Sequence, residues 1–148
     1  MTGFSHIEEG GGIRMVDVGD KPMSRRRASA RARIEMKHET AVRLAELPKG
    51  DALTTAQVAG VMAAKRTSEL IPLCHPLPLS VVDVHVAIVE NGADVTSTVE
   101  TTAQTGVEME ALVAATVAAL TIYDMAKAVD DSMALTEVRL LEKTKEEV

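Results

Sequence analysis

Residues 81–102 have the sequence VVDVHVAIVENGADVTSTVETT, in which apolar and polar residues alternate over several positions on each side of Asn91-Gly92. A period of two places the apolar side chains on one face of a strand and the polar side chains on the other. Asn-Gly is a strong signal for a two-residue β-hairpin turn. This stretch therefore predicts two antiparallel strands, at 81–89 and 94–102, each with one buried face.

Two further strands are predicted on either side of this hairpin. Residues 30–36, ARARIEM, alternate in the same way and predict a strand with one wet face. Residues 135–141 predict a last strand, followed by a charged tail.

Three helices are predicted between the strands. Residues 38–47 form a short helix that ends before Pro48-Lys49-Gly50, and residues 52–70 form a second with Asp51 as a candidate N-cap. Small residues recur along one stripe of this second helix, which indicates close packing. A capping box at Thr105–Glu108 opens a long helix that runs to about residue 129.

The predicted order is β, α, α, β, β, α, β, which is the split βαβ plan of a ferredoxin-like sandwich. We therefore expect an α+β fold, with a four-stranded antiparallel sheet and helices packed on one face. Residues 29–148 form this single domain, and residues 1–28, with Gly10-Gly11-Gly12 and Lys21-Pro22, form a flexible N-terminal arm. The helix at 106–129 is apolar nearly all round, so we expect it at a subunit interface of a homo-oligomer.

Composition excludes several classes of protein. The net charge of −6, with one Phe, one Tyr and no Trp, argues against a nucleic-acid binder. The longest apolar helix carries Asp124 and Lys127, and the N-terminus lacks a signal pattern, so we expect no membrane association and a cytoplasmic protein. A single cysteine and four histidines without ligand spacing predict no protein-held metal. Basic residues crowd the first quarter of the chain, where a cationic patch would suit a triphosphate.

A loop stiffened by Pro72, Pro76 and Pro78 contains the adjacent pair Cys74-His75. Because residues before proline are extended, the loop holds His75 in a fixed direction. His75 is then either a positioned proton shuttle or a loop histidine hydrogen-bonded to backbone. Cys74 lacks a predicted neighbouring base, which favours a packing role over that of a nucleophile.

Charged residues at the two ends of the long helix need an explanation. Glu108 fits the capping box, but Glu110 stands among apolar residues and requires a partner or a function. Asp124 and Lys127 lie three residues apart on one face, as a structural ion pair or as functional groups. Lys49, on its own, is an ordinary solvated lysine on a turn.

Two runs in the chain are highly specific: LIPLCHPL at 70–77 and VEMEAL at 107–112. Together with MVDV at 15–18, KGD at 49–51, AAKRT at 63–67 and residues 118–129, they resemble the cyclic pyranopterin monophosphate synthase family of molybdenum-cofactor biosynthesis (protein C family) over nearly the whole chain. The resemblance implies that residues 29–148 are a catalytic domain. One departure is Gln104, which stands where lysine is common in the family and puts one candidate phosphate contact in doubt.

The resemblance implies a lyase that converts 3′,8-cyclo-7,8-dihydro-GTP to cyclic pyranopterin monophosphate and releases pyrophosphate. A radical SAM GTP cyclase would supply this GTP-derived substrate. The resemblance implies no organic cofactor, although Mg²⁺ can accompany the substrate triphosphate. It also implies a dimer-based homohexamer with the site at the dimer interface.

The family's functional positions carry over to two sets of residues. In the catalytic set, Lys49 and Lys127 would be the acid–base groups, and Asp124 would hold Lys127. His75 and Glu110 would orient the substrate or shuttle protons. The substrate-binding set, in which Arg26 and Lys21 would neutralise phosphate, consists of Leu73, Cys74, His75, Glu108, Met109, Glu110, Arg26 and Lys21. Glu110 and Asp124 are about 21 Å apart along one helix, so we expect two subunits to complete each site.

Two other classes of protein compete with an enzyme. A ferredoxin-like effector-binding domain would need no polar groups on the long helix, so Glu110, Asp124 and Lys127 count against it. A nucleic-acid module using Arg25-Arg26-Arg27 is opposed by the net charge and the missing aromatic residues.

Overall fold

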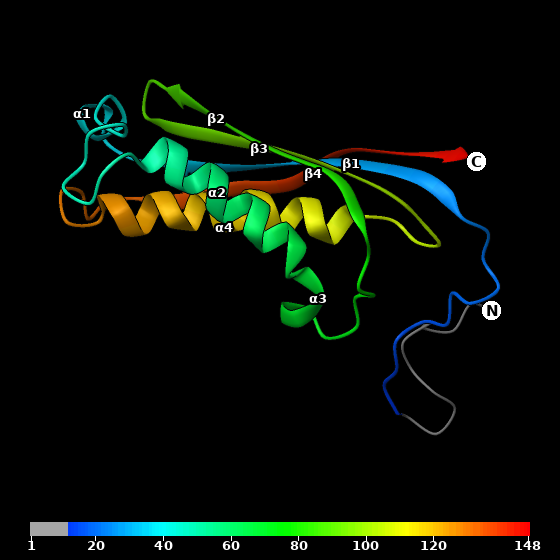
Figure 1. Cartoon of the computed structure of the whole chain (residues 1–148). Helices are drawn as coiled ribbons and strands as arrows, with labels where there is room; N and C mark the ends of the chain where they lie inside the picture. The colour runs from blue at the N-terminus through cyan, green and yellow to red at the C-terminus, as the bar shows by residue number, and fades with distance from the viewer. Residues whose placement is uncertain (1–11) are drawn as a thin grey trace.

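The computed structural model describes residues 12–148, and these form a two-layer α+β domain. The four strands make one antiparallel sheet in the order β2-β3-β1-β4. Helices α2, α3 and α4 lie on one face of this sheet (Figure 1). The predicted ferredoxin-like sandwich is confirmed, with the elements β1 (Ser24–Glu35), α1 (His38–Ala41), α2 (Ala52–Lys65), α3 (Thr67–Leu70), β2 (Leu79–Val89), β3 (Gly92–Ala103), α4 (Glu108–Ala126) and β4 (Ala134–Glu147).

The predicted hairpin joins β2 to β3. Its register pairs Val82 with Val99 and closes with Val89 opposite Gly92. A Cβ atom at Gly92 would collide with the carbonyl oxygen of Ile34 on β1, so only glycine allows this close approach. The turn is therefore specified both by its own backbone and by the neighbouring strand.

All four strands are longer than the sequence predicts, and the difference is largest for β1 and β4. β1 begins at Ser24, so residues 24–28, which we assigned to the N-terminal arm, lie in the sheet. β4 continues to Glu147 in place of the expected charged tail. The reason is backbone pairing, because β1 and β4 are hydrogen-bonded from Ser24 opposite Glu147 to Glu35 opposite Ala134. Residues 1–11 of the predicted arm lie outside the described residues.

The predicted helices differ from the observed ones at their ends. Asp51 is the N-cap of α2, and its Oδ1 accepts hydrogen bonds from the backbone N–H of Leu53 and Thr54 at 2.9 and 3.2 Å. α1 is a single turn, and the second predicted helix divides into α2 and α3 at Arg66. The predicted capping box is wrong: α4 has no side-chain cap and begins at Glu108, two residues too late for that glutamate to occupy the third helical position.

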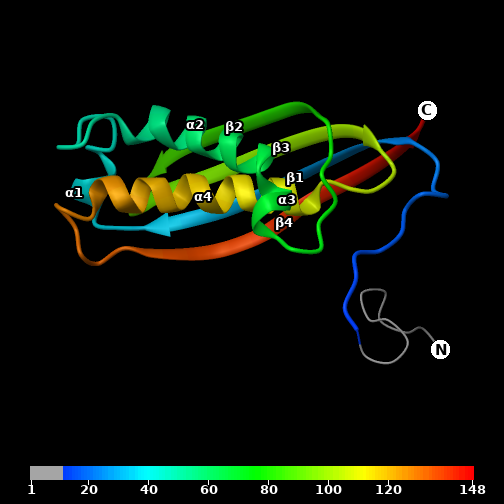
Figure 2. The same cartoon turned by 60° about the horizontal axis from the view of Figure 1, so that its bottom comes forward.

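Helix α4 lies at the centre of the core, packed on the sheet and against α2 (Figure 2). At Gly60 of α2 a Cβ atom would lie 3.0 Å from the carbonyl oxygen of Ala114, so the two helices touch through backbone. By length and composition α4 could cross a membrane, but 56% of that stretch is buried inside the domain, as in a core helix. Leu120 on α4 remains 51% exposed, so one side of the helix is uncovered within a single chain.

Asp130, just after α4, ties the end of this helix to the connection between β1 and α1. Its Oδ2 accepts hydrogen bonds from the backbone N–H of Lys37 at 3.0 Å and from the hydroxyl of Thr40 at 2.8 Å. Its Oδ1 accepts from the N–H and hydroxyl of Ser132 at 2.8 and 2.6 Å. Burial alone would raise the pKa of Asp130, but these donors hold it well below its usual range.

We predict that Asp130→Ala lowers the free energy of unfolding at neutral pH by about 3 kcal/mol, because buried donors lose a charged acceptor. A carboxylate with a depressed pKa adds stability above its unfolded pKa of about 3.9, and this stability is lost as the pH falls towards the folded pKa. The difference between the parent and the variant should therefore shrink on acidification. Urea unfolding at a fixed protein concentration measures it, and exposed Asp131→Ala is the matched control. Equal losses in the two variants would contradict this role for Asp130.

Candidate active site

A pocket of about 360 Å³ opens at the N-terminal end of α4. Its walls come from the proline-rich loop before β2, from the first turn of α4 and from the segment that precedes β1. The predicted substrate-binding residues in its lining are Lys21, Leu73, Cys74, His75, Glu108, Met109 and Glu110. The structure therefore brings these residues together, although the two specific runs, at 70–77 and 107–112, are well separated in the sequence.

His75 lies in this pocket and also hydrogen-bonds to backbone. Its Nε2 lies 2.6 Å from the carbonyl oxygen of Val16. The backbone hydrogen bond that one interpretation of His75 expects is therefore present, and the residue also lines the pocket, while its role as a proton shuttle stays a prediction. A side chain fixed in this way is suited to a directed hydrogen bond with a ligand.

Glu110 is buried, with only 4% of the residue exposed. Burial raises the pKa of its carboxyl, and the neighbouring charge of Glu108 raises it further. Burial, Glu110 and Glu108 likewise raise the pKa of the Cys74 thiol. A raised pKa keeps the thiol protonated, which supports the packing role predicted for Cys74.

Lys49, Asp124 and Lys127 form a second cluster, at the C-terminal end of α4. The Nζ atom of Lys127 is 2.9 Å from Oδ1 of Asp124, and the Nζ of Lys49 is 3.2 Å from Oδ2. Hydrogen bonds from Lys127 and then Lys49 lower the pKa of Asp124. All three side chains are about half exposed, at 49% for Lys49 and 57% for the other two.

A tight turn presents Lys49 to this cluster. The backbone N–H groups of Leu47 and Gly50 each donate to the other residue's carbonyl, at 3.0 and 2.9 Å. Gly50 has a φ angle of 118°, in the region that favours glycine. The turn at Pro48-Lys49-Gly50 therefore fixes the position of the lysine, although α1 itself already ends at Ala41.

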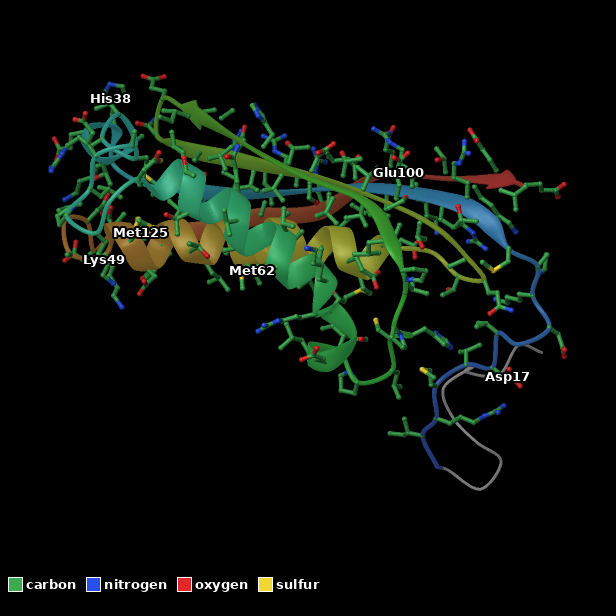
Figure 3. All side chains as sticks on the ribbon, viewed as in Figure 1. Asp17, His38, Lys49, Met62, Glu100 and Met125 are labelled. Carbon is green, nitrogen blue, oxygen red and sulfur yellow. The ribbon has the colours of Figure 1, made fainter. Side chains whose placement is uncertain are left out.

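The pocket and the lysine cluster lie at opposite ends of α4. In Figure 3, Lys49 lies at the Met125 end of this helix, and Asp17 of the N-terminal segment lies towards the other end. α4 runs unbroken from Glu108 to Ala126, so Glu110 and Asp124 are about 21 Å apart along its axis. One chain does not bring the two halves of the predicted catalytic set together.

Arg26 is the one predicted substrate residue outside both groups. It lies on β1, is half-buried, and its Nε donates to the hydroxyl of Ser24 at 2.5 Å. Val16 and Val18 line the pocket although they were not among the predicted site residues. The run MVDV at 15–18 was their only signal, and it is weak alone.

Within the part of the chain that the structure describes, no cluster of metal-binding side chains lies at the pocket. Among residues 12–148, no group of three or more His, Cys, Asp or Glu side chains is arranged to hold a metal ion. A cation at this site would therefore depend on oxygen atoms of the ligand and on water.

The fold and the site define a ferredoxin-like domain with a pocket of carboxylates and a separate lysine cluster. Over residues 15–146 the sequence matches the MoaC family. A cyclic pyranopterin monophosphate synthase of Oleidesulfovibrio alaskensis is 57% identical over 147 residues, covering 97% of this chain and 92% of the relative. The protein of the same name from Novosphingobium aromaticivorans is 53% identical over 145 residues, covering 97% and 92%. The chain therefore belongs to the MoaC family, as its resemblance predicts.

A third relative is a longer protein. The molybdenum cofactor biosynthesis bifunctional protein of Chlorobaculum tepidum is 52% identical over 143 residues, which cover 95% of this chain and 46% of that relative. The present domain thus corresponds to about half of it.

Proposed function

We propose that this protein is a cyclic pyranopterin monophosphate synthase of molybdenum-cofactor biosynthesis, a lyase that acts on 3′,8-cyclo-7,8-dihydro-GTP and releases pyrophosphate. The observation that carries the proposal is the meeting of residues 73–75 and 108–110 in the walls of one pocket. The shared name of the similar relatives supports it. A radical SAM GTP cyclase would supply the substrate, and the reaction would take place in the cytoplasm.

The residues suit a reaction of proton transfers and phosphate displacement, which needs no redox step. We assign acid–base roles to Lys49 and Lys127, because lysine can serve as acid, base or phosphate clamp. Asp124 holds both ammonium groups within hydrogen-bonding distance. His75 and Glu110 would orient the substrate or shuttle protons at the other end.

Charge divides the proposed site into two parts. The pocket contains Glu108 and Glu110 with a single lysine, Lys21, so it disfavours a highly charged triphosphate. Its carboxylates suit the amino and ring N–H groups of a guanine-derived ring. The lysine cluster, with two cations and one carboxylate, suits phosphate, and Mg²⁺ would bind through the phosphates and water.

A complete site requires a second subunit. Antiparallel pairing of α4 with its copy across a two-fold axis would place Glu110 of one chain near the lysine cluster of the other. The exposed side of α4 at Leu120 supports such an interface. We propose a dimer of this kind as the unit of a homohexamer.

The test is turnover by the purified protein. Incubated with the radical-enzyme product, it should yield cyclic pyranopterin monophosphate, identified by mass spectrometry, and an equal amount of pyrophosphate. The Oleidesulfovibrio alaskensis relative serves as the control for the substrate preparation. If that relative releases pyrophosphate and this protein does not, the proposed function is wrong.

We predict that Arg26→Gln raises KM and weakens the salt dependence of kcat/KM, because long-range attraction between a cation and phosphate is screened by salt. The loss should be about tenfold at low ionic strength, as for one charged contact. Arg25→Gln is the matched control, since Arg25 lies on the opposite face of β1. Its Nη1 atom is 3.6 Å from Oε2 of Glu146. If both variants keep the parent's salt profile, Arg26 does not contact the phosphates.

A further inference from the structure

Residues 16–21, here called the strap, form part of the pocket although they belong to no helix or strand. Val16, Val18 and Lys21 line the pocket. Figure 1 shows this segment running away from β1 along the outside of the domain. The strap can serve as a wall of the pocket only if hydrogen bonds to the rest of the fold hold it in place.

The strap's internal hydrogen bonds shape it without attaching it. The backbone N–H of Lys21 donates to the carbonyl oxygen of Val18 at 3.0 Å, and the N–H of Gly19 donates to Oδ1 of Asp17 at 2.8 Å. These bonds make a turn. They do not connect the strap to the sheet or to α4.

Gln104, in the connection between β3 and α4, fastens the end of the strap next to β1. Its side-chain nitrogen donates to the carbonyl oxygens of Gly19 and Lys21, at 3.2 and 3.1 Å. Two facing carbonyl oxygens can only accept, so the amide of Gln104 must present its NH₂ group to them. This residue therefore uses both of its donor hydrogens on the strap.

His75 fastens the other end of the strap through Val16. The carbonyl oxygen of Val16 accepts a hydrogen bond, so the proton of a neutral His75 ring must lie on Nε2. The remaining ring nitrogen, Nδ1, then carries the lone pair. The position of the strap thus decides which nitrogen of His75 can accept a proton.

We propose that Gln104 is a positioning residue: by holding the strap, it fixes one wall of the pocket and keeps His75 as the Nε2–H tautomer with Nδ1 as the acceptor. Gln104 itself does not line the carboxylate pocket and acts only through the strap. Its effect on turnover rests on the function proposed above. Its effect on the histidine ring does not.

The test compares two substitutions of similar reach. Gln104→Glu sets carboxylate oxygens against two carbonyl oxygens and releases the strap, whereas Gln104→Lys keeps a donor. We expect Gln104→Glu to lower kcat/KM about tenfold or more, mainly through KM, and Gln104→Lys to stay within about threefold of the parent. The ¹⁵N spectrum of His75, assigned with His75→Gln, should show one neutral tautomer in the parent and in Gln104→Lys, and a mixture in Gln104→Glu.

Two results would overturn the positioning role of Gln104, and a third would overturn only the proposed function. An unchanged His75 spectrum in Gln104→Glu overturns the proposal, whatever the kinetics. Equal losses of kcat/KM in the two variants also overturn it, because they would show that Gln104 acts by packing and not as a donor. A parent protein that releases no pyrophosphate defeats the proposed function alone, since the ring spectrum still tests the strap.

Discussion

Lys127→Ala should lower kcat by about 10²- to 10⁴-fold, the usual contribution of a positioned acid–base group, while the fold remains intact. Lys127 caps the C-terminal end of α4 and is 57% exposed in one chain, so its truncation removes no core packing. The loss should fall on kcat more than on KM, because proton transfer matters most in the transition state. Lys143→Ala, at an exposed lysine of β4, is the matched control.

Lys49→Ala should have an effect of the same order, because both lysines share the carboxylate of Asp124. If the two lysines act as a unit, the double variant should lose little more activity than the more damaging single variant. A Lys127→Ala enzyme that turns over at nearly the parental rate would leave the pair with Asp124 as an ordinary surface ion pair. Such pairs contribute only about 0–1 kcal/mol to stability, and unfolding measurements would then show a similarly small change.

The elements that the sequence predicts well are those whose signal is local. The hairpin at 81–102 is specified by a period of two and by Asn91-Gly92, both of which can be recognised without knowing the rest of the fold. The N-cap Asp51 is local in the same sense, because its partners Leu53 and Thr54 follow it directly. The split βαβ order depends only on such local elements, and it was confirmed.

The strand ends could not be predicted in this way. Residues 142–147 of β4 are all exposed and mostly charged, so they have no apolar alternation to identify a strand. They pair with the basic start of β1 through backbone hydrogen bonds that no side-chain pattern encodes. The ion pair between Arg27 and Glu142, at 2.6 Å, joins these two stretches across 115 positions of the sequence.

The pocket was predicted in part. Its two specific runs supplied the loop before β2 and the start of α4, but of the strap only Lys21 was in the predicted site. Val16 is held at the pocket by a hydrogen bond with His75, fifty-nine positions away, and such contacts have no local signature. The salt bridge of Asp124 with Lys127 was foreseen from their spacing, but the approach of Lys49 depends on the turn closed at Gly50.

Opposite ends of α4 carry the two halves of the proposed active site. Glu110 and Asp124 are about 21 Å apart along this helix, too far for both to reach one reacting centre in a single chain. In one chain, moreover, the side chains of the lysine cluster are still about half exposed to solvent. Deeper burial is one way in which a protein adjusts a lysine for acid–base chemistry. A second subunit would supply that burial and the missing carboxylate together. We therefore expect each active site to take Glu110 from one chain and Lys127 from the other.

Mixing two inactive variants tests this arrangement. Glu110→Ala and Lys127→Ala are each expected to be inactive alone, and they should regain activity when they are unfolded and refolded together. Random pairing makes about half of the dimers hybrids, and each hybrid has one intact site, so about a quarter of the parental activity should return. Lys127→Ala mixed with Lys49→Ala is the matched control, because both changes fall on the same half of the site. Lys49 and Lys127 lie in one cluster on the same chain, so each site of these hybrids still carries one of the two changes and no activity should return. A site contained within one chain would give no recovery in either mixture. If hybrid dimers form, as shown by mass spectrometry, and the Glu110→Ala and Lys127→Ala mixture does not exceed its separate variants, the composite site is wrong.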